Sequence, residues 1–543
     1  MTEAAPGPPG SRRIRRLARD TFGFEQLRAG QEDAIRSVAA GRDTLAVLPT
    51  GWGKSAIYQL AALLIPGPTV VVSPLIALQR DQVQALLANE VTAAEANSQV
   101  GKGERDDAFS RLAAGDLEFL FLAPEQLANE DVLGQAVAAE PSLFVVDEAH
   151  CISAWGHDFR PDYLGLADVA EALGRPPILA LTATAAPPVR AEIVERLRLR
   201  DPEVVVRGFD RPNLRLAVER FASGEEKRAA VVDAVAGATP PGIVYVATRR
   251  AAEEVATELA DHGVDAEPYH AGLPAGRRRD TESAFADGRL PVVVATTAFG
   301  MGIDTANVRY VYHHDVADSL DSYYQEIGRA GRDGEPATAL LFYRPEDLGL
   351  RRFFASGARV EVEQASEVAE AWSKRGPDID LEETGERTGL SVTTVASVVR
   401  GLEDTSVAAG APPDPDDAAE QVVAAQDARR RVDQSRVDMM RAYAESRGCR
   451  RQVLLGYFGE SLDQPCGNCD RCLEGGAGDA HGAGRAEDAA PFPLHGWVSH
   501  DAWGRGQVMD SSEGKLVVFF ESAGYKTLAL DVVLDRGLLR PDG

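Results

Sequence analysis

The sequence predicts an α/β protein with two doubly wound parallel-sheet lobes, followed by a helical module with a cysteine cluster and by a small C-terminal β-barrel. Short β-branched runs alternate with Ala-rich helical stretches from about residue 20 to residue 345. Such runs are typical of parallel strands that helices cover on both faces. A break at Arg207–Pro212 separates two such series. The lobes are therefore expected at 1–207 and 208–345, with ligand sites at the carboxyl ends of their strands.

Seven apolar runs are the clearest strand candidates. Each is four or five residues long, which suits a buried strand better than a helix. They are Thr69–Ser73, Phe119–Leu122, Leu143–Val146, Ile178–Leu181, Ile243–Val246, Val292–Ala295 and Val308–Tyr312.

Composition narrows the class of protein. A chain of 543 residues with 44% hydrophobic residues can bury several cores, and no run reaches the roughly 18 apolar residues of a membrane span. The Pro/Gly-rich start is followed by arginines without an apolar region, so no secretory signal is predicted and a cytoplasmic protein is expected. The net charge of -27 weighs against nucleic-acid binding, although arginines concentrate between residues 429 and 451.

A phosphate-binding loop is predicted between an apolar strand and a helix. The segment PTGWGKS follows Leu45–Val47 and precedes a helix-forming stretch. Loop N–H groups and the helix N-terminus can then face the phosphates of ATP, while Lys54 reaches the β and γ oxygens and Ser55 ligates Mg²⁺. The loop residues expected to bind the nucleotide are Thr50, Gly51, Gly53, Lys54 and Ser55.

Two acids end another apolar strand. Leu143–Val146 runs directly into Asp147 and Glu148. Asp147 is expected to hold Mg²⁺, and Glu148 to orient or deprotonate the attacking water. An exposed acidic turn is the alternative, but it does not explain why acids terminate a fully apolar strand downstream of a Gly-Lys-Ser loop.

The second series carries the block QEIGRAGR at residues 325–332. Hydrolysis needs positive charge on the γ-phosphate in the transition state, and an arginine from a moving lobe raises the rate roughly 10³–10⁵-fold. Gln325, Arg329 and Arg332 are therefore candidate catalytic residues. The alternative is a pair of surface arginines spaced i,i+3 on a helix.

Four of the five cysteines have the spacing C-x16-C-x2-C-x2-C: Cys449, Cys466, Cys469 and Cys472. Four thiolates satisfy a tetrahedral structural Zn²⁺, and Cys-x-x-Cys pairs on tight turns commonly supply them. An iron–sulfur cluster also takes four thiolates and is the alternative. A zinc module is expected at 425–474, and Cys151 is expected to be a small buried hydrophobe.

Taken in order, these blocks resemble the RecQ family of superfamily 2 helicases. The likeness covers about residues 20–345 and again 449–472. It implies two RecA-like lobes. Besides the loop, the acids and the cysteines, it rests on FEQLRAGQ (24–31), VSPLIAL (72–78), DEAHCIS (147–153), ALTATA (180–185), YHAGL (269–273) and AFGMGID (298–304).

The resemblance implies an adenine site ahead of the phosphate loop. Phe24 would stack on the base, Gln31 would hydrogen-bond its edge, and Arg28 would support both. A packing cluster at the start of a helix is the alternative.

The resemblance also implies an aromatic-rich loop, WGHDFRPDY at 155–163, that couples DNA contact to ATP hydrolysis. Aromatic faces interleaved with a cation suit single-stranded nucleic acid, since stacking is worth about 1–3 kcal/mol per base. A buried aromatic cluster is the alternative. The loop residues implicated are Trp155, His157, Phe159 and Arg160. The resemblance also implies that Thr182 and Thr184 link the two lobes to the DNA strand.

The region before the zinc module, 346–410, is predicted to be helical. Within it, Glu383–Leu402 has the pattern of a helix–turn–helix, with Gly389 at the turn and Ser391 as N-cap, or of an ordinary helical hairpin. Ala411–Asp417 is predicted to be a linker.

A second linker is predicted at 475–492, followed by the small barrel at 493–543. The barrel is similar to the Tudor-like C-terminal domain of superfamily 1 repair helicases, which implies a site for a protein partner. A passive β-cap is the alternative. The winged helix that often follows the zinc module in the RecQ family is not evident in this sequence.

The expected function is that of an ATP-dependent DNA helicase acting in repair or recombination. It would use ATP, Mg²⁺ and Zn²⁺, translocate on single-stranded DNA in the 3′ to 5′ direction by family analogy, and unwind duplex or forked DNA at the nucleoid. No membrane partner is expected. The alternatives are an RNA-directed or non-unwinding superfamily 2 translocase, and a recruitment protein whose ATPase acts as a switch.

Overall fold

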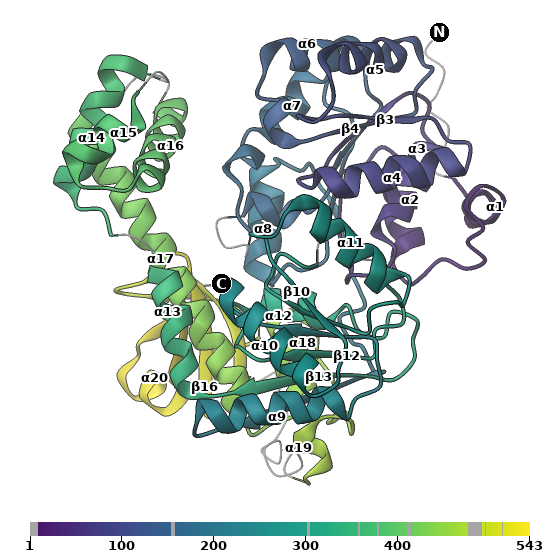
Figure 1. The fold of residues 1–543 in the computed structure, drawn as a ribbon. Coiled ribbons are helices and arrows are strands. Elements are labelled where there is room, and N and C mark those ends of the chain that lie inside the picture. The colour runs from purple at the N-terminus through teal and green to yellow at the C-terminus, as the bar shows by residue number, and fades with distance from the viewer. Residues whose placement is uncertain are drawn as a thin grey trace. The chain divides into compact units, whose positions relative to one another are not determined.

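The computed structural model describes residues 9–153, 158–300, 305–356, 359–376, 379–409, 414–475, 491–494, 496–512 and 514–542. The chain forms two compact units (Figure 1). Residues 1–344 and 443–486 make up the first, and residues 345–442 and 487–543 the second. Among the described helices, none combines the length and apolar composition of a membrane span.

The first lobe is a seven-stranded parallel sheet with helices on both faces (Figure 1). The strand order is β3-β4-β2-β5-β6-β1-β7. The strands are β1 (Thr44–Val47), β2 (Thr69–Val72), β3 (Ala93–Ala96), β4 (Phe119–Leu122), β5 (Leu143–Val146), β6 (Ile178–Thr182) and β7 (Glu203–Val206). The helices are α1 (Ser11–Phe22), α2 (Gln31–Ala39), α3 (Lys54–Ala62), α4 (Ile76–Ala88), α5 (Lys102–Ala114), α6 (Glu130–Ala138), α7 (Leu166–Ala172) and α8 (Pro187–Arg196).

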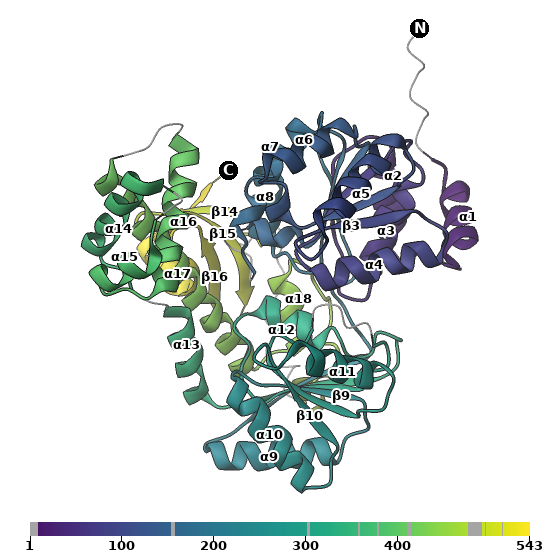
Figure 2. The ribbon, with the colours of Figure 1, turned by 45° about the horizontal axis from the view of Figure 1, so that its top comes forward.

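The second lobe is a six-stranded parallel sheet with the order β10-β11-β9-β12-β13-β8. Figure 2 labels β9 and β10 of this sheet beside helices α9 to α12. Its strands are β8 (Leu214–Arg220), β9 (Gly242–Tyr245), β10 (Ala266–Tyr269), β11 (Val292–Ala295), β12 (Tyr310–His313) and β13 (Ala337–Tyr343). Its helices are α9 (Gly224–Ala236), α10 (Arg249–Asp261), α11 (Ala275–Ala286) and α12 (Leu320–Ile327).

The structure confirms the predicted fold class of two parallel-sheet lobes. Each of the seven predicted apolar runs overlaps a strand, with ends that differ by no more than two residues. The predicted break at Arg207–Pro212 lies between β7 and β8, where the chain leaves one sheet and enters the other.

The cysteine-bearing segment belongs to the same compact unit as the two lobes. It contains α18 (Arg450–Tyr457) and α19 (Asp470–Leu473). Cys469 forms a parallel β-bridge with Leu216 of β8, and Asp470 accepts a hydrogen bond from Val218 N at 3.3 Å. The segment is thereby attached to the edge of the second sheet.

One long helix, α17 (Pro415–Glu445), differs from the sequence-based division of this region. The prediction placed a linker at Ala411–Asp417 and began the zinc module at 425. Instead Asp414 caps the helix by accepting from Asp416 N at 3.0 Å, and Pro415 occupies its first turn. Proline and acids are favoured in a first turn, and no helix-breaking residue follows, so the helix runs through both predicted boundaries.

The second unit holds a helical part, with α13 (Leu348–Ser356), α14 (Val362–Arg375), α15 (Leu381–Thr388) and α16 (Val392–Ala409). Gly389 ends α15 in the left-handed conformation, and Ser391 Oγ accepts from Thr394 N at 3.2 Å, as an N-cap does. Val395 and Val398 of α16 pack with Val368 of α14 in one buried core. The turn between α15 and α16 lies where the sequence predicted it.

The C-terminal part of the second unit is a five-stranded antiparallel sheet with the order β17-β16-β15-β14-β18. A buried cluster that includes Val508, Val518 and Phe520 forms its core. The elements are β14 (Trp497–His500), β15 (Gly504–Ser512), β16 (Lys515–Phe520), β17 (Gly524–Ala529), α20 (Leu530–Arg536) and β18 (Leu539–Asp542).

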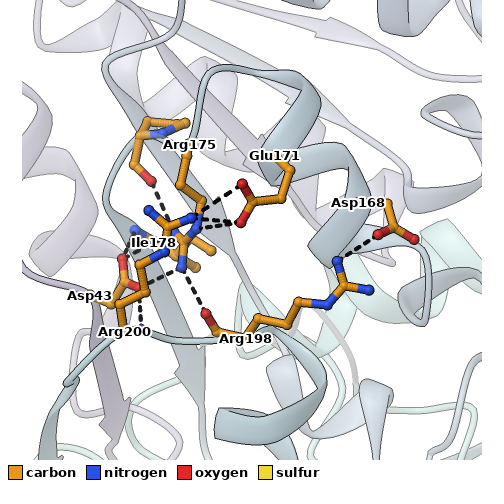
Figure 3. A network of polar contacts seen from close by, with 8 residues as sticks. Asp43, Asp168, Glu171, Arg175, Ile178, Arg198 and Arg200 are labelled. Carbon is orange, nitrogen blue, oxygen red and sulfur yellow. Dashed lines mark hydrogen bonds and ion pairs between the residues drawn. The ribbon is translucent and has the colours of Figure 1, made fainter.

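A buried polar network joins three strands of the first lobe at their amino ends (Figure 3). Asp43 precedes β1 and is 5% exposed. Its carboxylate accepts from Ile178 N at 2.9 Å, from Arg200 N at 2.7 Å and from Arg175 Nη2 at 2.7 Å. Because β6 begins at Ile178 and β7 follows Arg200, one carboxylate aligns the start of three adjacent strands.

Replacing Asp43 by Ala is expected to lower the free energy of unfolding of this lobe by about 3–5 kcal/mol, because it leaves the buried Arg175 guanidinium and two N–H groups without their acceptor. Chemical denaturation measures this loss. The matched control is Asp168→Ala, whose partner Arg198 is 58% exposed, and it should cost less than about 1 kcal/mol. Equal losses for the two variants would contradict the role given to Asp43.

Candidate nucleotide site and zinc centre

A cavity of about 730 Å³ opens at the carboxyl ends of the strands, a volume typical of small-molecule sites. The first lobe lines it with the phosphate loop, the two acids and the segment around Phe24. The second lobe contributes Gly300, Gln325, Arg329 and Arg332. Residues that the sequence predicted separately in the two lobes therefore share one cavity.

The phosphate loop connects β1 to α3, which begins at Lys54. Gly51 and Gly53 have φ angles of 76° and 75°, in the left-handed region that favours glycine. Both also lie against neighbours: a Cβ added at Gly53 would be 2.8 Å from Gln31 Nε2, and one at Gly51 would be 3.0 Å from Arg332 Cδ. The loop is thus compact, and an arginine of the second lobe packs directly against it.

Gln31 and Arg28, two of the residues predicted to bind adenine, hold the phosphate loop in this structure. Gln31 is buried, accepts from Arg28 N at 2.7 Å, and donates to the carbonyls of Trp52 and Gly53, each at 2.9 Å. The Arg28 guanidinium donates to Gly51 O. Phe24, by contrast, lines the cavity with 36% of its surface exposed.

The two acids follow β5 as the sequence predicted. Asp147 is half-buried, and desolvation together with the adjacent Glu148 raises its pKa to about 7 against the opposing effect of Lys54. Its carboxylate accepts from Glu148 N at 2.9 Å. Glu148 has a φ of 47°, a left-handed conformation that costs a non-glycine residue about 1–3 kcal/mol and is typical of functional sites.

A chain of polar contacts links the acids to the second lobe. The Glu148 carboxylate lies 3.3 Å from His150 Nδ1, which lies 2.8 Å from Thr182 Oγ1. Thr182 Oγ1 donates to Thr184 O at 3.1 Å, and Thr184 Oγ1 accepts from Gln325 Nε2 at 3.1 Å. Thr182 and Thr184 are buried, so the first-lobe part of this chain is shielded from water, and the part-buried bond from Gln325 joins it to the second lobe.

His150 is a residue that the sequence-based assignment missed, although it lies in the quoted DEAHCIS block. Burial lowers its pKa, but the neighbouring Cys151 and Glu148 raise it more, so that the net pKa lies well above the usual value. A charged His150 would hold the Glu148 carboxylate in place. Its position two residues after Glu148 was the signal that could have identified it.

The two arginines of the second lobe are not surface residues. Arg329 is 8% exposed and donates to Gly300 O, and Arg332 is half-buried beside Gly51. The alternative of two solvent-exposed helical arginines therefore does not describe this structure. The loop that follows α12 delivers both side chains to the cavity.

The predicted coupling loop is described from Asp158 onward, and Trp155 and His157 lie outside the described residues. Phe159 is half-buried. Arg160 donates to Asp158 Oδ2 at 3.1 Å and to Pro74 O at 3.2 Å. The end of the loop is thereby tied to the segment that follows β2, at the rim of the cavity that Pro74 and Asp158 line.

The four predicted cysteine ligands lie together. Their sulfur atoms are all within 4.8 Å of one another, and Cys466 Sγ is 3.9 Å from Cys472 Sγ. Zn–S bonds of about 2.3 Å in a tetrahedron place the sulfurs about 3.8 Å apart, so the four side chains fit Zn²⁺. Cys449 Sγ and Cys466 Sγ also accept from backbone N–H groups at 3.3 and 3.4 Å, as zinc-bound thiolates do. Cys151 is buried and is not one of the four.

Comparison with known protein families divides the chain in the same way. Residues 28–192 match the DEAD/DEAH box helicase model, residues 226–334 the helicase conserved C-terminal domain, and residues 415–473 the RecQ zinc-binding model. The Bacillus subtilis "Probable ATP-dependent DNA helicase RecS" is 36% identical over 490 residues, which cover 88% of this chain and 95% of the relative. The chain belongs to the RecQ family of superfamily 2 helicases.

Other RecQ relatives are longer than the matching region. The "ATP-dependent DNA helicase RecQ" of Pasteurella multocida is 37% identical over 454 residues, covering 83% of this chain. The chain spans about three fifths of that relative, 61%, and 63% of the Haemophilus influenzae enzyme of the same name. Among solved structures, the Mycobacterium smegmatis helicase Lhr bound to ssDNA and AMP-PNP aligns with a TM-score of 0.50 and 21% identity, over 71% of this chain and 57% of that one. At this identity the likeness concerns the fold alone, and it agrees with the helicase fold that the family models indicate.

Purified protein is expected to contain about one zinc ion per chain, and Cys466→Ser should lose it, because three sulfurs cannot complete the tetrahedral site. Elemental analysis measures the metal. Cys151→Ser, which removes a thiol outside the cluster, should keep the zinc. Iron with acid-labile sulfide, or full zinc retention by Cys466→Ser, would contradict the assignment.

Proposed function

We propose that this RecQ-family chain is an ATP-dependent DNA helicase that uses Mg²⁺ for ATP hydrolysis and carries a structural Zn²⁺. One observation supports this function above the others: a single cavity joins Lys54, Asp147 and Glu148 of one lobe to Arg329 and Arg332 of the other. A motor needs this arrangement, because hydrolysis then depends on the position of the two lobes.

Within this proposal, each group has a role set by its place in the cavity. The N–H groups of the phosphate loop and Lys54 bind the β- and γ-phosphates. The Ser55 hydroxyl and the Asp147 carboxylate line the same cavity and would hold Mg²⁺, which neutralises phosphate charge when bound. Glu148 orients and deprotonates the attacking water. Arg329 and Arg332 stabilise the negative charge that develops on the γ-phosphate.

Of the three residues expected to bind adenine, only Phe24 keeps that role in this proposal. The Phe24 ring stacks on Phe22 with centroids 5.6 Å apart, and its exposed surface in the cavity would stack on the base. The amide of Gln31 is already engaged, because its oxygen accepts from Arg28 N and its nitrogen donates to the phosphate-loop carbonyls of Trp52 and Gly53. We therefore assign Gln31 and Arg28 to shaping the phosphate loop, so that occupation of the base site and the conformation of the loop are connected.

The loop at 155–163 would couple DNA contact to ATP hydrolysis. Phe159 and Arg160, with Trp155 and His157, would contact a single strand, and Arg160 joins this loop to the rim of the nucleotide cavity through Pro74. Thr182 and Thr184 would transmit the contact to Gln325, to which Thr184 is already bonded. The substrate would be single-stranded DNA and forked or duplex DNA, with 3′ to 5′ translocation by family analogy.

Two finer assignments complete the proposal. The C-terminal sheet of residues 493–543 would bind a protein partner, and deleting it should then release that partner in a pull-down while ATP hydrolysis persists. The enzyme would act in the cytoplasm, at the nucleoid. The first assignment rests on the resemblance to a Tudor-like domain, and the second on the sequence-based expectation of a cytoplasmic protein.

The proposed activity is tested by comparing the wild type with Lys54→Ala and Glu148→Gln. Single-stranded DNA should stimulate ATP hydrolysis by the wild type more than RNA does, and a duplex with a 3′ single-stranded tail should be unwound. Both variants should lose hydrolysis, while Glu148→Gln should still bind nucleotide because its phosphate loop is unchanged. ATP binding by the wild type without polynucleotide-stimulated turnover would favour a switch protein, and stronger stimulation by RNA would favour an RNA-directed translocase.

A further inference from the structure

The contacts of the zinc module point to a role beyond stability. We propose that this module, here the segment Tyr443–Leu473, positions the arginine-bearing loop of the second lobe, residues 328–332, for ATP hydrolysis. The inference rests on the proposed function, since it concerns the same arginines. It assigns positioning roles to Tyr457, Arg451 and Arg211.

Helix α18 connects the cysteine cluster to the second lobe. It begins directly after Cys449, which is its N-cap, and ends at Tyr457. Next to the cysteines, the fully buried Arg450 forms an ion pair with Asp470 at 3.1 Å and donates to Tyr443 O and Ala444 O. The cysteine end of α18 is therefore fixed by the four sulfurs and by a buried ion pair, and the helix transmits that position to its other end.

The far end of α18 holds helix α12. Tyr457 OH donates to the buried Asp321 carboxylate in the first turn of α12. The Phe458 ring lies 4.8 Å from the ring of Tyr324, and Tyr323 OH lies 3.5 Å from Tyr443 OH. Three side chains of α12, those of Asp321, Tyr323 and Tyr324, thus contact the zinc module.

Helix α12 carries part of the catalytic machinery. Gln325, near its C-terminal end, makes the bond to Thr184 of the first lobe, and the chain continues directly into Arg329. On another side of α12, Glu326 lies 2.7 Å from His313 Nε2, and both side chains are buried. With the zinc module and β12 both attached, a shift of α18 displaces the loop that follows α12.

A second path reaches that loop without passing through α12. Arg451 of α18 donates to Arg211 O at 3.0 Å and to Leu214 O at 2.7 Å. The Arg211 guanidinium in turn donates to Ala330 O at 2.8 Å and Gly331 O at 2.9 Å. Arg211 and Arg451 are 9% and 6% exposed, so these bonds are shielded from water. The backbone between Arg329 and Arg332 is therefore held by the zinc module through one intervening residue.

The module also contacts the segment that connects the lobes. Phe458 stacks on Phe209 with ring centroids 4.5 Å apart, and Phe209 N donates to Glu460 at 3.4 Å. Arg190 of α8 in the first lobe donates to Phe458 O, and burial lowers the pKa of Arg190 to about 10. One short turn, residues 458–460, thus contacts the first lobe, the connecting segment and α12.

Tyr457→Phe is the sharpest test, because it removes one hydroxyl and leaves the ring in place. DNA-stimulated kcat for ATP should fall about five-fold or more, with the KM for ATP and the zinc content unchanged and with a loss in melting temperature no greater than that of Tyr343→Phe, which loses a comparable bond. Asp321→Ala should give the same defect, and the double variant should be no slower than either single one. Asp321→Asn, which still accepts the tyrosine hydrogen bond, should restore most of the rate.

The matched control is Tyr343→Phe. Tyr343 OH donates to Glu445 at 2.7 Å, so this change removes the same kind of bond between the second lobe and the end of α17, but at β13 rather than α12. Its kcat should stay within about two-fold of the wild type.

The outcomes separate this inference from the proposed function. If the wild type hydrolyses ATP with DNA stimulation and Tyr457→Phe does so equally fast, the positioning role is wrong. If kcat falls only together with the zinc content, or with a melting temperature well below that of Tyr343→Phe, the module serves stability alone and the inference is overturned. It is also overturned if the kcat of Tyr343→Phe falls as far as that of Tyr457→Phe. A wild type without DNA-stimulated turnover would instead reject the proposed function.

Discussion

The proposed function depends on one electrostatic constraint: the cationic groups that would neutralise the phosphates of a nucleotide come from both lobes. Lys54 lies at the start of α3 in one lobe, and Arg332 of the other lobe packs against Gly51 of the same phosphate loop. Each set is fixed by its own sheet, because loops at the carboxyl ends of parallel strands meet at one edge. The hydrogen bond from Gln325 to Thr184 then joins the two sets directly.

Buried polar contacts fix the positions of the side chains in the nucleotide site. Small side-chain shifts matter for catalysis, since groups displaced by about 1 Å can lose two orders of magnitude in rate. Glu148 is held beside His150 in a left-handed backbone conformation, and the loop of Arg329 is bonded through Arg211 to the zinc module. The zinc module therefore helps to position the residues of the nucleotide site. At the amino ends of the strands in the first sheet, the Asp43 network keeps β1, β6 and β7 in register.

The sequence predicted those parts of the molecule that local patterns determine. Fully apolar runs such as Val292–Ala295 predicted strands. The phosphate loop and the acids were predicted from their place at the ends of apolar strands, and the zinc ligands from the spacing of the cysteines. Strand β3, with the sequence AAEA, and β10, which contains Pro268, lack the β-branched pattern and were missed because their partners in the sheet determine them. Gln31 was named as a site residue, but its bonds to a loop 21 residues away could not be predicted from a local pattern. Arg211 and Tyr457 were missed because their partners lie more than 100 residues away in the chain.

Single-turnover hydrolysis by Arg332→Ala tests the two-lobe site most directly. With saturating DNA, the variant should bind ATP within a few-fold of the wild type, since Lys54 and the phosphate loop are intact. Its hydrolysis rate should fall roughly 10³-fold or more, the contribution expected of an arginine that acts in the transition state. A hydrolysis rate equal to that of the wild type would show that the second lobe does not complete the site, and the account of a shared cavity would then be wrong.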